Sequence, residues 1–102
     1  MNLTITARRF KLPDDLRDYI EEKSQRLTRY YENILDTEVI LGWEKQARYA
    51  ELKINANGTP VVLKETSEDL RKSFDLVLDK AERQLKRTKN KERADRDIIK
   101  GA

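Results

Sequence analysis

The sequence predicts an α+β fold, a two-layer sandwich in which two helices pack on one face of a four-stranded sheet. Four segments alternate between apolar and polar residues, as strands with one buried face do. Two longer segments repeat their apolar residues every three or four positions, as amphipathic helices do. The order of these segments is β-α-β-β-β-α. All their apolar faces are buried together when both helices cover the same side of the sheet.

The first strand is expected within residues 2–10, where Leu3, Ile5 and Ala7 alternate with polar neighbours. Pro13 suits the first turn of the helix that follows, because no backbone N–H is needed there. We expect this helix to run from about Pro13 to Tyr31. One broad face of it gathers the apolar and aromatic side chains Leu16, Tyr19, Ile20, Leu27, Tyr30 and Tyr31.

Three more strands are expected in the middle of the chain. Residues 37–43 predict one, in which Val39, Leu41 and Trp43 point the same way. Residues 48–56 predict the next, with Tyr49 on its outward face. Its inward side chains are Ala50, Leu52, Ile54 and Ala56. The Asn-Gly-Thr-Pro turn over 57–60 then predicts a hairpin to a strand over 61–65.

The last helix is expected to begin after a cap at Thr66 or Ser67. Its apolar stripe consists of Leu70, Phe74, Val77, Ala81 and Leu85. Residues 94–102 show no sustained period, so they are predicted to form a disordered tail. The chain is thus expected to contain one domain, over residues 1–93.

The composition of the 102-residue chain argues against most enzyme classes. It contains no cysteine and no histidine, so thiolate nucleophiles, cysteine-ligated zinc and the commonest general base are absent. We therefore expect no enzymatic activity, no cofactor, no metal site and no small-molecule substrate. The sequence has no apolar run long enough for a signal peptide or a membrane span, which predicts a cytoplasmic protein without a membrane partner.

The net charge of +3 is concentrated near the end of the last helix. Seven basic and two acidic residues stand between Lys80 and Arg93. On a helical wheel, the residues of one flank are Lys80, Arg83, Arg87 and Lys91. The simplest interpretation is a solvated helix end, with Arg83 paired to Asp79. The alternative is a polyanion that relieves the repulsion along the basic flank, and phosphates are the expected one.

The first helix carries a second basic group. Lys23 falls within the apolar stripe, and Arg26 lies at its border. Packing of the lysine stem with the amine in water is one explanation of Lys23. Side-by-side helices would instead bring Lys23 and Arg26 next to the basic flank and form a furrow. Since exposed strand faces offer few aromatic side chains, such a furrow is expected to bind nucleic-acid backbone rather than bases.

Two stretches of the chain carry a family pattern. The first contains Leu3-Thr4-Ile5-Thr6, Leu16-Arg17-Asp18-Tyr19-Ile20, Lys23, Leu27 and Tyr30. The second contains Asp69-Leu70, Phe74-Asp75, Leu78-Asp79-Lys80, Arg83-Gln84-Leu85 and Lys89. Over about residues 2–91 the chain resembles the ribosome hibernation promoting factors and ribosome-associated inhibitors, also called sigma-54 modulation proteins, in their short form. It departs from them at Arg71-Lys72-Ser73-Phe74, where relatives often have a tyrosine and alanines.

The resemblance implies a fold similar to double-stranded-RNA-binding domains and a partner, the small ribosomal subunit. Such factors bind 16S rRNA in the decoding channel and inhibit translation under starvation or in stationary phase, because they block mRNA and tRNA binding. The family's rRNA-contacting positions carry over to Lys23, Arg26, Lys80, Arg83, Lys86, Arg87 and Lys89. The family assignment is weaker for three further residues, namely Arg8, Arg9 and Lys91, the last of which also belongs to the basic flank.

Two other functions stay open at this point. One is a double-stranded-RNA-binding or RNA-chaperone module outside the ribosome, and the other is a protein-interaction domain that modulates transcription. No apolar stripe is left over for a partner surface, so we expect a monomer in isolation.

Overall fold

The computed structural model describes the backbone of residues 1–29, 34–56 and 59–101, and the side chains of these residues except 29, 34, 35, 59 and 88–101. Its elements are β1 (Asn2–Ala7), α1 (Asp14–Ser24), the 3-10 helix η1 (Gln25–Arg29), β2 (Ile34–Glu44), β3 (Ala47–Ala56), β4 (Thr59–Ser67) and α2 (Leu70–Gly101). The predicted order of strands and long helices is confirmed. No helix in these ranges is long and apolar enough to cross a membrane.

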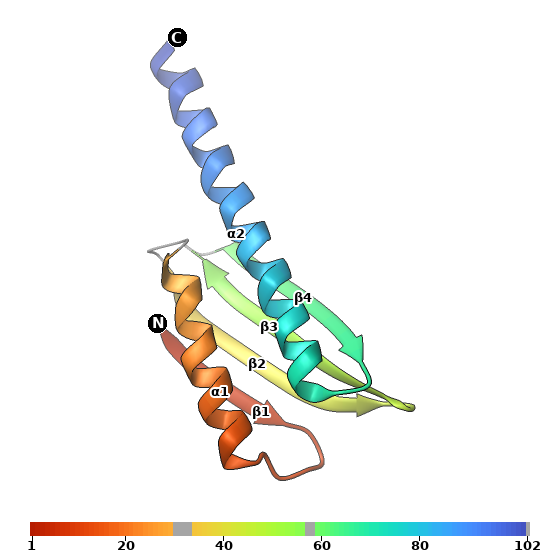
Figure 1. The fold of residues 1–102 in the computed structure, drawn as a ribbon. Helices are drawn as coiled ribbons and strands as arrows, with labels where there is room; N and C mark the ends of the chain where they lie inside the picture. Colours follow the sequence, from red (N-terminus) through yellow and green to blue (C-terminus); the bar gives the residue numbers. More distant parts are fainter. Residues whose placement is uncertain (30–33, 57–58, 102) are drawn as a thin grey trace.

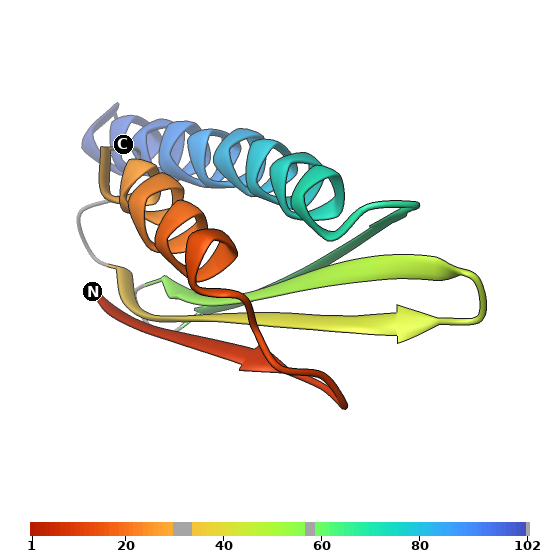
Figure 2. The ribbon, with the colours of Figure 1, turned by 60° about the horizontal axis from the view of Figure 1, so that its bottom comes forward.

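The four strands form one mixed sheet in the order β1-β2-β3-β4. β1 runs parallel to β2, and the other neighbouring pairs are antiparallel. Two parallel strands need a crossover connection, and α1 provides it. Both helices lie on one face of the sheet, whereas the opposite face carries no element (Figures 1 and 2). The predicted two-layer sandwich is therefore confirmed.

The core lies between the helices and the sheet. The strands bury the inward side chains that alternation predicted, among them Val39, Leu41, Leu52 and Ile54. The helical layer contributes Leu16, Ile20, Leu27, Phe74, Val77, Ala81 and Leu85. All of these side chains are at most 8% exposed, so the helical and strand periods identified the core correctly.

The helix boundaries differ from those predicted. α1 ends at Ser24, and the chain tightens into η1 up to Arg29; Tyr30 and Tyr31 lie outside the described residues. α2 begins at Leu70 rather than directly after Thr66 or Ser67, because Asp69 acts as its cap and accepts the backbone N–H of Arg71 at 3.2 Å.

α2 has helical backbone to Gly101, so it includes most of the segment in which the sequence predicted a tail. The division between a domain over 1–93 and a tail over 94–102 stays a prediction.

Two aromatic side chains on the sheet differ in burial from what alternation alone predicts. Trp43 follows Val39 and Leu41 in the alternation, yet it is 59% exposed. Tyr49 lies on the outward face as predicted but is buried, because it pairs with Gly42 of β2 and covers it. A Cβ atom at Gly42 would meet the Tyr49 ring at 2.5 Å, so the absence of a side chain there makes room for the ring.

Candidate nucleic-acid interface

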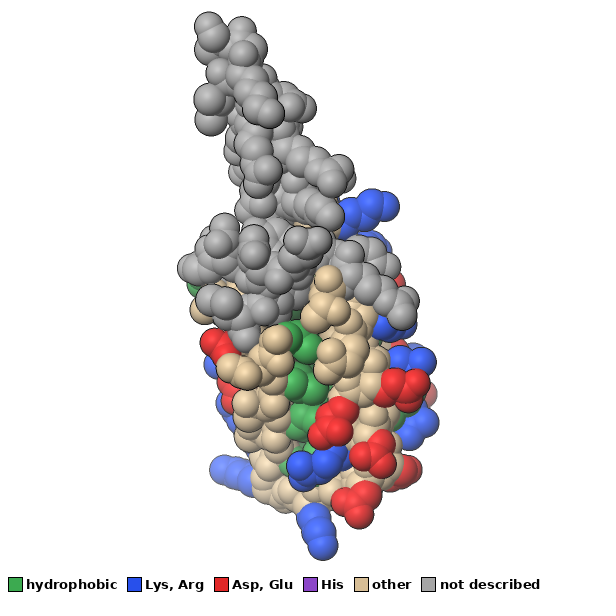
Figure 3. Space-filling view, turned by 90° about the vertical axis from the view of Figure 1, so that its left-hand side faces the viewer, with side chains coloured by type: hydrophobic (Ala, Val, Ile, Leu, Met, Phe, Trp, Pro, Cys, Tyr) green, Lys and Arg blue, Asp and Glu red, His purple; other side chains and the backbone are tan. Residues whose placement is uncertain are grey.

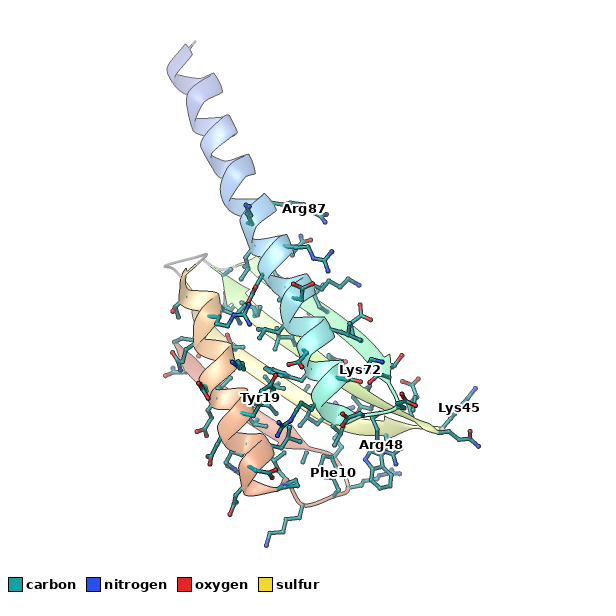
Figure 4. The ribbon with its side chains drawn as sticks, viewed as in Figure 1. Phe10, Tyr19, Lys45, Arg48, Lys72 and Arg87 are labelled. Carbon is teal, nitrogen blue, oxygen red and sulfur yellow. The ribbon has the colours of Figure 1, made fainter. Side chains whose placement is uncertain are left out.

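The basic flank of α2 lies on the side of the helix away from α1. The Lys80 amine is 3.3 Å from the Glu65 carboxylate on β4, so this flank faces the fourth strand. Arg83 pairs with Asp79 at 2.6 Å, as its i,i+4 spacing predicted, and both side chains are more than half exposed. Arg87 extends from the same side of α2 (Figure 4).

Lys86 and Arg87, like Lys72 in the first turn of α2, form no ion pair among the described side chains. Lys86 and Arg87 are both exposed. We use the term α2 basic flank for Lys80, Arg83 and Arg87. Lys86 follows Glu82 by four residues, so it stands on the side of α2 that faces α1. Lys89 and Lys91 continue along the helical backbone, and their side chains lie outside the described set.

The side of α2 that faces α1 is acidic rather than basic. The Tyr19 hydroxyl donates a hydrogen bond to Asp75 at 2.5 Å. Arg26, which the structure places on η1, contacts the buried Glu82 carboxylate at 3.1 Å. Acidic and basic side chains are mixed on the α1 side of the molecule (Figure 3).

The predicted furrow between the helices is therefore wrong. The helical wheel correctly separated the acidic and basic sides of α2 but did not show which of them α1 would contact. Lys23 is half-buried, and its amine lies 5.8 Å from the centre of the Tyr19 ring, over its own helix. The structure thus brings neither Lys23 nor Arg26 into contact with the α2 basic flank.

The two weaker candidates, Arg8 and Arg9, lie in the loop after β1. Arg8 donates a hydrogen bond to the hydroxyl of Tyr49 at 3.1 Å. Tyr49 alternates with the inward-facing Ala50 and Leu52, so this bond lies on the outward face of the sheet. Together with Trp43 and Tyr49, the two arginines line a surface hollow. Sequence reasoning missed Trp43 as a surface residue, since its alternation placed it beside core residues.

The sequence was then compared with known protein families. The family model described as sigma 54 modulation protein / S30EA ribosomal protein matches residues 3–93. The chain belongs to this family. The match confirms the resemblance found over residues 2–91 and covers the sheet except Asn2, all of α1 and most of α2.

Individual members of the family are similar along nearly the whole chain. The ribosome hibernation promoting factor of Azotobacter vinelandii is 36% identical over 92 residues, which cover 90% of this chain and 86% of the relative. That of Pseudomonas putida is 30% identical over 102 residues, which cover 100% and 97%.

Two solved structures share the fold. The N-terminal domain of Thermus thermophilus protein Y superimposes with a TM-score of 0.78 at 32% identity, covering 86% of this chain and 99% of that one. A ribosomal subunit interface protein from Coxiella burnetii gives the same TM-score at 24% identity, over 88% and 99% of the two chains, a likeness in fold alone.

Proposed function

We propose that the protein is a ribosome hibernation factor that acts in the cytoplasm without catalysing a reaction. In this proposal it binds 16S rRNA in the decoding channel of the small subunit as a monomer. It inhibits translation under starvation or in stationary phase because it occupies the space of mRNA and tRNA. Support comes from its family and from two relatives that are named ribosome hibernation promoting factors.

The observation that carries the proposal is the α2 basic flank. Its cations stand on one side of α2, and Arg87 is exposed with no carboxylate partner among the described side chains. Lys86, on the other side of the helix, has no such partner either. Like charges one helical turn apart repel each other. Phosphate groups would relieve that repulsion and release counterions, so a nucleic-acid backbone is the ligand that this arrangement favours.

The remaining candidates are ranked by the partners that they already have. Lys80 and Arg83 each share one surface ion pair, which a phosphate can replace at little cost. Arg26 holds a buried carboxylate and is the least free to leave its partner. Lys89 and Lys91 extend the flank in sequence, whereas Lys23, Arg8 and Arg9 would contact RNA from other parts of the surface.

A salt series with a double variant tests the flank. Arg83→Ala combined with Arg87→Ala removes about two phosphate contacts, so the plot of log affinity for small subunits against log salt should flatten by about one unit or more. The matched control combines Arg17→Ala with Lys53→Ala, which removes the same charge from α1 and β3, outside the residues assigned to RNA. This control should keep the slope of the unchanged protein.

Two outcomes would contradict the proposal. An equal loss of slope in both double variants would mean that only net charge matters. Sedimentation of the protein with bulk RNA rather than with small subunits from starved cells would favour an RNA-chaperone module.

A further inference from the structure

An exposed aromatic group lies at the end of the sheet, away from the α2 basic flank. Trp43, near the end of β2, is 59% exposed although it is the largest apolar side chain of the protein. Phe10 stacks against it with ring centres 6.2 Å apart, and the Arg48 guanidinium lies 4.0 Å from the centre of its ring (Figure 4). The ring is therefore held in place and still open to a ligand.

Three arginines lie beside Trp43, and one of them, Arg48, also lines a second hollow with Asp15, Glu68 and Asp69. The hollow beside Trp43 is lined by Arg8, Arg9 and Tyr49, and no acidic residue lines it. Arg48 and Lys45 have no carboxylate at ion-pair distance within the described part of the chain. The one carboxylate of the adjoining turn, Glu44, is bound by Lys64 at 2.6 Å.

Two of these cations are kept at a conformational cost. Arg9 has φ 66° and Lys45 has φ 57°, in the left-handed region that favours glycine. They are the two residues other than glycine with positive φ in the described chain, and they belong to the two loops that flank Trp43. Strained backbone of this kind concentrates at binding sites.

We infer that Trp43 is a stacking platform for an unpaired RNA base, and that Arg8, Arg9, Lys45 and Arg48 hold the adjoining phosphates. Base stacking on an exposed aromatic ring among cations is the mode by which single strands are bound without reading their sequence. The inference deepens the proposed function, since it adds a single-stranded contact to a backbone contact. It gives this chain two RNA-binding surfaces at different ends of the domain.

The charge of the patch favours RNA over a protein partner. A protein interface of similar size would have an apolar centre with few charges. Here Arg8, Arg9 and Arg48 lie beside Trp43, and Phe10 stacks on its ring. The unpaired base can come from rRNA or from a free strand such as mRNA, because both offer the same chemistry.

Trp43 is the single tryptophan of the protein, so its fluorescence reports on this site alone. We expect a short single-stranded RNA to quench the emission in a saturable way. An abasic strand of the same length, which offers phosphates without bases, should leave the emission unchanged. Equal quenching by both strands, or no quenching by either, overturns the inference.

Variants then measure the contribution of the ring. Trp43→Ala should weaken binding of the RNA about fivefold or more, whereas Trp43→Phe should keep most of the affinity. Val62→Ala is the matched control, because Val62 is 58% exposed on β4, outside the patch. Thermal melts of all three variants separate loss of binding from loss of folding, and an affinity of Trp43→Ala equal to that of the unchanged protein contradicts the stacking role.

Small subunits freed of mRNA identify the source of the base. Weaker binding of Trp43→Ala to them assigns the base to rRNA, and unchanged binding together with quenching by the oligonucleotide assigns it to a free strand. Weaker binding without any quenching would point to a ribosomal protein and overturn the inference. Because the oligonucleotide measurement needs no ribosome, quenching without co-sedimentation would sustain this inference while the proposed function fails.

Discussion

The guanidinium of Arg26 contacts both carboxylate oxygens of Glu82, at 3.1 and 3.2 Å. Glu82 is 7% exposed and is the single buried charged residue among the described side chains. The contact joins η1 to α2. A residue that family resemblance assigns to rRNA thus has a structural partner inside the protein.

Replacing Arg26 should therefore cost stability. Arg26→Ala leaves a buried carboxylate without its partner, and the free energy of unfolding should fall by about 1–3 kcal/mol. Because the Arg26 side chain is 45% exposed, the loss should stay below that of a fully buried pair. Urea unfolding measures it. If Arg26→Ala and the double variant with Glu82→Gln are equally stable, the charge of Glu82 does not need Arg26.

The hydrogen bond from Tyr19 to Asp75 should make stability depend on pH in the alkaline range. This bond to a carboxylate is the main reason why the pKa of Tyr19 is raised from 10.0, and burial and the charge of Asp75 add to it. The stabilisation is complete below the unfolded pKa and is lost as pH rises through the higher folded pKa. Tyr19→Phe should thus be less stable at neutral pH and approach the unchanged protein at strongly alkaline pH.

Ultraviolet titration tests the same pair directly. The difference in phenolate absorbance between the unchanged protein and Tyr19→Phe isolates this one of four tyrosines. Asp75→Asn should return its midpoint towards 10.0, since the carboxylate acceptor is gone. A midpoint that does not move would show that Asp75 is not the cause.

The close approach of Gly42 and Tyr49 should make position 42 intolerant of any side chain. A methyl group there would meet the ring at 2.5 Å, and Tyr49 cannot easily move because Arg8 holds its hydroxyl. Gly42→Ala should lower the free energy of unfolding by about 1–3 kcal/mol. In a Tyr49→Ala background the same change should be nearly neutral. A double-mutant cycle without coupling would contradict this packing.

Lys23 should contribute more to ligand binding than to the stability of the fold. Its amine makes a cation–π contact with Tyr19 at 5.8 Å, an interaction that contributes only about 0.5 kcal/mol at an exposed site. Lys23→Met should therefore melt within a few degrees of the unchanged protein and bind small subunits less tightly. Thermal melts and co-sedimentation decide; a much lower melting temperature with normal binding would assign Lys23 to packing alone.

The sequence predicted those features that depend on one element at a time. Alternation placed Leu41 and Leu52 on the inner face, because the pleat of a strand fixes the side of each residue locally. It also placed Trp43 on that side. It could not show that this end of β2 lies beyond the helical layer, since the cover comes from other elements.

Contacts between elements could be predicted less well from the sequence. The wheel separated Glu82 from Arg83 on α2, but the contact of Glu82 with Arg26 depends on where α1 lies across the sheet. The crossover between parallel β1 and β2 places α1 over that edge, and right-handed crossovers are the strong rule. The pairing of Gly42 with Tyr49 likewise required the register of β2 against β3, which the turn residues at 45 and 46 do not reveal.

Because of the left-handed backbone at Arg9 and Lys45, thermal stability and RNA affinity favour different residues at these two positions. A side chain in that conformation costs about 1–2 kcal/mol relative to glycine, so a selection for survival at high temperature would drive both positions towards glycine. Each such step would remove a cation from the neighbourhood of Trp43. A thermostable version of this domain would then bind RNA less tightly. A chain under selection for binding should keep arginine or lysine at these positions, although their backbone conformation favours glycine.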